Sequence, residues 1–173
     1  MSGRNRMMRR MMKDDITEDP GYDNGEYKTQ PRGLAAALQL MFMMTSSPRQ
    51  LQKQYPTTAA ADEYIERWQQ RVLEHEDAND YLYAFEASRD YDPAPKLDRI
   101  IAPLIAVNSA DDQVNPPELG VMEADMPKLK HRHYVLIPIS DKTRGHGTHS
   151  LPAVWKGYLA DFLAQIERGA AAR

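Results

Sequence analysis

The sequence contains no cysteine among its 173 residues. This absence excludes disulfide frameworks, thiolate nucleophiles and cysteine-rich zinc sites. Nor is there an apolar run of the roughly 20 residues that a membrane span needs, because the segment 33–45 is interrupted by Gln39 and is followed by Ser46 and Ser47. Residues 1–13 lack the apolar core and cleavage site of a signal peptide. We therefore expect a soluble protein, cytoplasmic as written, with the location of any longer parent left open.

Neither sign of charge is in large excess. Lys and Arg total 22 against 25 Asp and Glu, which gives a net charge of -3. This balance argues against a dedicated nucleic-acid binder. The basic residues of 4–13 are followed by acidic residues in 14–19, a pattern typical of a solvated helix face. We predict neither nucleic acid nor a membrane as a partner.

The first half of the chain, residues 1–92, is predicted to be helical. In the first helix, predicted over 5–18, Met8, Met11, Met12 and Ile16 recur at steps of three and four, which places them on one helical face. The Asp-Pro-Gly sequence at 19–21 would end the first helix, and a loop would follow at 22–32. The same signals predict four further helices, at 33–45, 48–55, from 57 or 58 through 73, and 78–88.

The second half, residues 93–173, has the pattern of an α/β fold. The continuous apolar runs at 103–107 and 134–138 suit buried parallel strands. Helical spacing predicts one helix at 116–126 and another at 151–166. Two parallel strands alone bury too little surface for a stable sheet. The sequence therefore predicts a sheet that is incomplete.

Acidic and histidine residues follow the two predicted strands. Asp111 and Asp112 come after the first strand, and His146, between two glycines, comes after the second. The carboxyl ends of parallel strands are where α/β proteins place catalytic groups. An acid followed 34 positions later by a histidine is the order of the last two members of a Ser, Asp, His triad. The alternative is that the aspartates are turn residues. His149 has metal-ligand spacing to His146, but carboxylates nearby are sparse and we predict no metal site.

Several short motifs share an order along nearly the whole chain. They are Arg9-Arg10, Asp19-Pro20, Gly25-Glu26-Tyr27, Pro31-Arg32-Gly33-Leu34, Asp77-Ala78-Asn79-Asp80-Tyr81-Leu82-Tyr83, Asp112 four residues before Pro116-Pro117-Glu118, and Gly145-His146. Together they resemble the C-terminal half of an α/β-hydrolase of the homoserine O-acetyltransferase family. The resemblance implies a partial α/β-hydrolase fold, in which 1–92 form a helical lid and 93–173 supply the last two strands and helices of the parallel sheet.

The same resemblance assigns catalytic roles. It implies Asp112 as the acid and His146 as the general base of a Ser-His-Asp triad, with His149 as the second choice for the base. It assigns no substrate-binding residues. No serine of this sequence lies in a G-x-S-x-G elbow, so the nucleophile and the oxyanion donors that accompany it are absent. We expect the chain alone to be inactive.

The resemblance also implies the chemistry of the full-length enzyme. A small-molecule ester or acyl compound would be the substrate and acetyl-CoA the acyl donor, with no cofactor bound. Because Met1 lies where the family's chain continues, we expect a fragment, a truncated gene model or one half of a split protein, paired with an N-terminal half or with a second copy.

Two departures from the family pattern bear on specificity. Gly147 stands where the acetyltransferases carry an aspartate, and the acid loop 112–115 lacks their aromatic residues. A related hydrolase or acyltransferase acting on another ester is therefore a second expectation. A different alternative is a non-catalytic interaction module, or a decayed enzyme fragment that pairs with another chain.

Overall fold

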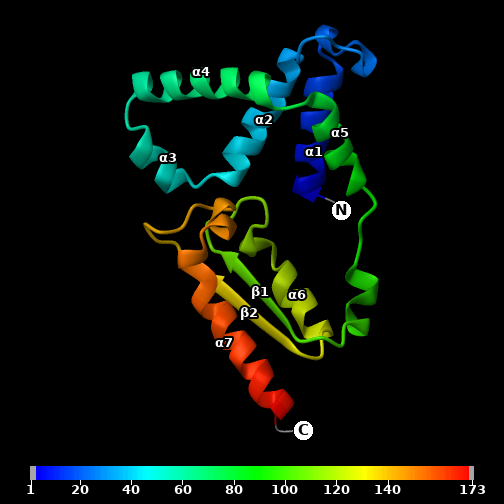
Figure 1. Ribbon diagram of the computed structural model, residues 1–173, viewed down its shortest axis with the longest axis vertical. Coiled ribbons are helices and arrows are strands. Elements are labelled where there is room, and N and C mark those ends of the chain that lie inside the picture. Colours follow the sequence, from blue (N-terminus) through cyan, green and yellow to red (C-terminus); the bar gives the residue numbers. More distant parts are fainter. Residues whose placement is uncertain (1–2, 172–173) are drawn as a thin grey trace. The chain divides into compact units, whose positions relative to one another are not determined.

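The computed structural model describes residues 3–171 and divides them into two compact units. The helical unit contains 3–44 and 51–92, and the sheet unit contains 45–50 and 93–171. Figure 1 shows the elements of each unit in chain order. No helix in the described part of the chain is both long and apolar enough to cross a membrane.

The five predicted helices of the first half are confirmed, with ends displaced by at most two residues. They are α1 (Gly3–Thr17), α2 (Arg32–Thr45), α3 (Pro48–Gln54), α4 (Thr58–His75) and α5 (Ala78–Ala87). A 3-10 turn, Pro20–Gly25, lies in the expected loop. Local signals begin two of the helices, because Thr57 Oγ1 accepts the backbone N–H of Ala60 and Asp77 Oδ1 accepts that of Asn79.

The core of the helical unit is apolar. On α1 the buried residues are Met8, Met12 and Ile16, which follow one another at steps of four. The prediction that Met11 shares this face is wrong, since its side chain is 55% exposed. Met11 and Met12 are about 100° apart around the helix, so both cannot face a narrow core.

The start of α2 packs directly on the end of α1. A Cβ built on Gly33 would lie 2.0 Å from the carbonyl oxygen of Asp15, so only glycine fits there. Asp19 holds the connection, since its Oδ1 accepts the N–H of Gly21 and its Oδ2 accepts that of Gly33. The Asp-Pro-Gly sequence thus ends one helix and positions the next.

Two parallel strands form the sheet of the sheet unit. They are β1 (Leu104–Ser109) and β2 (Arg132–Ile137), paired from Leu104 with Arg132 to Ser109 with Ile137. Their arrows point the same way in Figure 1. The predicted strands are confirmed, and α7 (Pro152–Ala171) confirms the predicted final helix and extends it.

The helix predicted over 116–126 is wrong in extent. A 3-10 turn (Pro117–Leu119), a short helix α6 (Val121–Asp125) and a second 3-10 turn (Met126–Lys128) occupy this segment and its continuation. Gly120 separates the first two elements because its φ is +64°, in the left-handed region that glycine tolerates. A further 3-10 turn, Ala94–Arg99, precedes β1.

The sheet unit leaves much of its apolar surface uncovered. Val107 of β1 and Leu136 of β2 are exposed, as are Leu159 and Leu163 of α7. Only two strands are present among the described residues. This agrees with the sequence prediction that the sheet is incomplete.

Candidate active site

The sheet topology brings the loops after the two strands to one edge. Because β1 and β2 are parallel and end in register at Ser109 and Ile137, the residues that follow each strand emerge side by side. Asp112 comes three residues after the end of β1. His146 follows β2 after the segment 138–145, and the N–H of Thr148 donates to the carbonyl of Gly145, so this bond encloses His146 in a turn.

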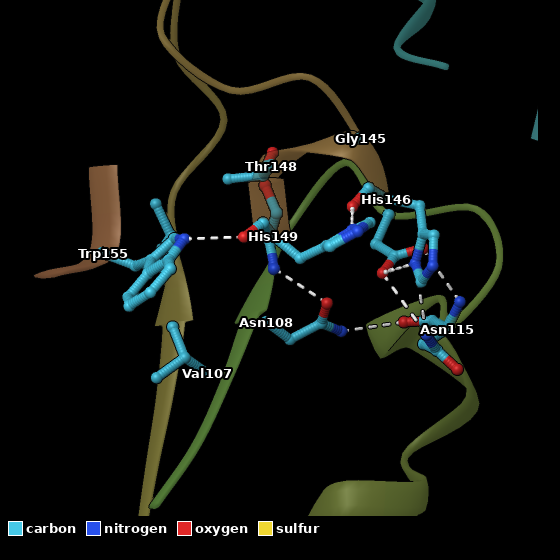
Figure 2. A pocket seen from close by; sticks show the side chains of 11 residues that line it. Val107, Asn108, Asn115, Gly145, His146, Thr148, His149 and Trp155 are labelled. Atoms are coloured by element: carbon cyan, nitrogen blue, oxygen red, sulfur yellow. Dashed lines mark hydrogen bonds and ion pairs between the residues drawn. The ribbon is translucent and has the colours of Figure 1, made fainter. Parts of the chain in front are cut away.

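Asp112 and His146 form a hydrogen-bonded pair. Asp112 Oδ2 lies 3.0 Å from His146 Nδ1. The carboxylate is 5% exposed and the imidazole is half-buried. Figure 2 shows the imidazole beside Asn115, whose Nδ2 lies 3.4 Å from His146 Nδ1. The structure therefore brings together the two residues that the sequence nominated as acid and base.

Backbone groups hold the Asp112 carboxylate in place. Its Oδ1 accepts the N–H of Val114 at 2.8 Å and that of Asn115 at 2.9 Å. Asp112 is thus also a turn residue, as the alternative interpretation proposed. The roles of turn residue and partner of the imidazole are compatible, because Oδ1 accepts the backbone N–H groups of the turn while Oδ2 faces the imidazole.

The pKa values of the pair move apart. Burial acts to raise the pKa of Asp112, but the hydrogen bonds from His146, Asn115 and Val114 and the charge of His146 lower it by more. The hydrogen bond to Asp112 raises the pKa of His146, with burial opposing and the Asp112 charge assisting. The environment therefore favours a carboxylate that stabilises a protonated imidazole.

The neighbouring carboxylate, Asp111, faces different partners. It accepts hydrogen bonds from Ser109 Oγ at 2.5 Å and Thr143 Oγ1 at 2.9 Å. Burial acts to raise its pKa, but these hydroxyls, the N–H of Gly145 and the side chain of Ser47 lower it by more. Asp112, not Asp111, is the partner of the imidazole.

His149 lies beside His146 without a carboxylate partner in the described part of the chain. Its Nδ1 is 2.6 Å from the carbonyl oxygen of His146, and the two ring centroids are 5.0 Å apart. Trp155 Nε1 donates to the His149 carbonyl at 2.9 Å. Among the described residues no group of three His, Cys, Asp or Glu side chains could hold a metal.

A cavity of about 310 Å³ adjoins the pair. Its lining includes residues that the sequence analysis did not nominate, among them Asn108, Thr148 and Trp155 (Figure 2). Asn108 Nδ2 donates to the carbonyl oxygen of Asn115 at 2.8 Å, which ties the end of β1 to the acid loop. Trp155 lies within the helix predicted at 151–166, but helical spacing gives no indication of a cavity.

The chain resembles known proteins in structure rather than in sequence. No protein-family model and no curated protein sequence matches the chain. Among solved structures it is similar to homoserine O-acetyltransferase from Bacillus anthracis, with a TM-score of 0.77 and 18% identity over 92% of this chain and 49% of that one. Esterase E22 gives a TM-score of 0.73 and 20% identity over 92% and 50% of the two chains.

A third similar structure is MGS-M2, an α/β-hydrolase from a Medee basin deep-sea metagenome library. Its TM-score is 0.65 with 14% identity, over 94% of this chain and 52% of that one. The chain thus spans about half the length of these solved proteins. It has the fold of half of an α/β-hydrolase, as the sequence motifs predicted for the C-terminal half.

Proposed function

We propose that this chain is the C-terminal part of an α/β-hydrolase-fold serine hydrolase or acyltransferase, similar to homoserine O-acetyltransferase. In this proposal it supplies the acid Asp112 and the base His146, and another half of the fold supplies the serine. The observation that carries the proposal is the 3.0 Å hydrogen bond between Asp112 Oδ2 and His146 Nδ1, at the carboxyl edge of a parallel sheet.

The pair has the chemistry that a serine nucleophile requires. With its proton on Nδ1 donated to Asp112, the imidazole presents an unprotonated Nε2. That nitrogen takes the proton from the serine hydroxyl as its oxygen attacks the acyl carbonyl, and later gives the proton to the leaving group. The raised pKa of His146 favours the imidazolium formed between these steps.

The nucleophile must come from outside these 173 residues. None of their serines has the G-x-S-x-G context. The solved relatives are about twice as long, which leaves room for an N-terminal half carrying the elbow and oxyanion donors. That half would belong to the same longer polypeptide or to a separate chain.

The proposed substrate is a small ester or acyl compound. The similar structures include an acetyltransferase and an esterase, which share a serine-centred acyl chemistry in this proposal. Acetyl-CoA is the acyl donor if the enzyme transfers rather than hydrolyses. Because Gly147 replaces the family's aspartate, hydrolysis of a different ester is proposed equally with homoserine acetylation.

Reconstitution tests the proposal. The chain is combined with an N-terminal half that contains a strand, the G-x-S-x-G elbow and the following helix, either fused to it or added as a second chain. The assembly is assayed for hydrolysis of p-nitrophenyl acetate and for labelling of the serine by a fluorophosphonate probe. We expect activity that His146→Ala reduces by about 10³-fold or more. His149→Ala is the matched control and should retain most activity. Activity that survives His146→Ala would overturn the assigned base.

A binding module is the second candidate, favoured by the exposed apolar residues Val107, Leu136 and Leu163. In that case another protein, or a second copy, covers the sheet without any acyl chemistry. A stable complex that Asp112→Asn and His146→Ala leave unchanged, together with no labelling of an elbow serine, would favour this candidate over the enzyme.

A further inference from the structure

The Asp111 carboxylate lies where three separate segments of the sheet unit meet. Ser109, at the end of β1, donates its hydroxyl to Oδ1. Thr143, in the loop after β2, donates its hydroxyl to Oδ2. The N–H of Gly145 and the side chain of Ser47, from the segment 45–50, also help to lower the pKa of the carboxylate. Through Thr143, Asp111 therefore joins the loop after β1 to the histidine loop, the segment 138–145 that leads from β2 to His146.

The histidine loop has little freedom at this point. Thr143 is fully buried, and its hydroxyl oxygen also accepts the N–H of Ser140. Gly145 has φ +60°, and a Cβ there would lie 2.5 Å from the carbonyl oxygen of Ser46. The Thr143 hydroxyl also lies 3.0 Å from the Ser140 carbonyl oxygen, within its own loop. Without the Asp111 acceptor only this local partner would remain, and the hydrogen bond that ties the loop to Asp111 would be lost.

We propose that Asp111 is a positioning residue for His146, holding the loop 143–145 so that the imidazole stays on Asp112. This inference rests on the proposed function. Thr143 and Gly145 precede His146 by three residues and one residue, so their anchorage fixes the backbone from which the imidazole projects. Asp111 acts through this loop and contacts neither the imidazole nor the reacting atoms.

The division of work between the adjacent aspartates follows from hydrogen-bond geometry. The contact between His146 Nδ1 and Asp112 Oδ2 is 3.0 Å long, and a displacement of about 1 Å would take it beyond the range of a hydrogen bond. Asp112 is already fixed by two backbone N–H groups. On the imidazole side, Asn115 Nδ2 lies 3.4 Å from Nδ1, and the backbone that carries the ring is held by the Thr143 hydroxyl on Asp111 and by the Thr148 N–H on the Gly145 carbonyl.

Imidazole NMR of the 173-residue chain tests this without any enzymatic activity. The readouts are the pKa of His146 and its tautomer, from the ring nitrogen shifts. Asp111→Asn removes a nearby charge, so a change in the pKa of His146 in this variant could come from the lost charge or from the lost positioning. Thr143→Val removes the loop hydroxyl at no change in charge. We expect it to lower the pKa of His146 and to shift the tautomer from Nδ1–H towards Nε2–H.

Two matched variants separate positioning from a general loss of structure. Thr143→Ser keeps the hydroxyl and should behave as wild type. Ser109→Ala removes a hydroxyl from the same carboxylate on the strand side and should leave the His146 tautomer unchanged. Backbone amide spectra establish that each variant is folded. If Thr143→Val does not fold, the tautomer in Asp111→Asn decides, because tautomer preference reports the hydrogen bond more directly than charge.

The outcomes distinguish this inference from the proposed function. If Asp112→Asn leaves the pKa and tautomer of His146 unchanged, the pair itself is absent and the proposed function fails. If Asp112→Asn changes both but Thr143→Val and Asp111→Asn leave the tautomer as in wild type, the pair stands and Asp111 is not a positioning residue. A change in the two variants that Thr143→Ser does not share supports the inference.

Discussion

The two units of the molecule bury opposite kinds of side chain. Most of the buried apolar residues that the structure describes lie in the helical unit, such as Ile16, Leu34 and Phe85. The buried polar residues described all lie in the sheet unit: Ser47, Gln50, Ser109, Asp112, Thr143 and Thr148. Apolar burial is non-directional, whereas hydrogen bonds fix orientation. The helical unit is therefore built for cohesion and the sheet unit for placing a few side chains.

The sheet unit also leaves its apolar surface exposed where a larger sheet would cover it. No described side chain of α7 over 152–169 is fully buried, although the helix carries a regular apolar face. The site loops are held by internal hydrogen bonds, whereas the sheet and α7 leave apolar side chains exposed. The following predictions separate these contributions, and the two tryptophans, Trp68 in α4 and Trp155 in α7, report on one unit each.

The largest expected effect is Gly33→Ala in the helical unit. Its Cβ would meet the Asp15 carbonyl at 2.0 Å, so α1 and α2 must separate. We expect a loss of more than about 3 kcal/mol, the top of the range for overpacking. Urea unfolding followed at Trp68 in a Trp155→Phe background measures it.

The control for this substitution is Gly169→Ala, because a Cβ at that position meets nothing within 4 Å. The Trp155 signal, followed in a Trp68→Phe background, should change little in Gly33→Ala. Equal losses at both tryptophans would mean that the two units unfold as one, and the comparison between them would fail.

A smaller effect is expected from Gly145→Ala in the sheet unit. The left-handed φ of +60° and the 2.5 Å approach to the Ser46 carbonyl both oppose a side chain. We expect a cost of about 1–3 kcal/mol, with the pKa of His146 falling as its loop moves. Gly147→Ala is the matched control, since its Cβ would make an ordinary 3.7 Å contact with Arg144. An unchanged His146 pKa in Gly145→Ala would show that the loop tolerates the shift.

The same contrast explains what the sequence could predict. Helices of the first half were readable because apolar burial imposes a periodic pattern, and the two strands because parallel strands are continuously apolar. The prediction for Met11 was wrong because four residues were assigned to a helical face that buries only three. Strand order placed Asp111 and Asp112 near His146, since parallel strands bring their following loops to one edge, and the family resemblance selected Asp112 of the two.

The polar network of the sheet unit was not predictable in the same way. Thr143 joins Asp111 through a hydrogen bond between loops far apart in sequence, and such bonds leave no periodic signature. Nothing in the pattern indicated that 45–50 pack with the sheet unit. The break at Gly120 was visible only as a glycine within an apolar segment, a weak signal by itself.

A gain of stability is expected from Gly157→Ala in α7. A Cβ there meets nothing within 4 Å, and the position lies inside a helix whose described side chains are not fully buried. Intrinsic helix propensity should therefore decide the outcome, with a gain of about 0.5–1 kcal/mol. Unfolding followed at Trp155 measures it. A loss would indicate that another part of the protein packs closely against this face of α7.

The smallest expected effect is a pH dependence confined to the sheet unit. Because folding raises the pKa of His146, its contribution to stability is fully present below the pKa of an unfolded histidine, about 6.5. That contribution is lost as the pH rises through the pKa of the folded state. Because folding lowers the pKa of Asp112, its contribution to stability is present above the pKa of an unfolded aspartate, about 3.9. That contribution is lost as the pH falls through the pKa of the folded state. The pair should therefore stabilise the sheet unit most between these two limits. Raising the pH from 6 to 9 should lower the free energy of unfolding measured at Trp155 more in wild type than in His146→Gln. The free energy measured at Trp68 should show no such difference. Equal pH profiles of the two proteins at Trp155 would show that the hydrogen bond orients the imidazole without stabilising the fold.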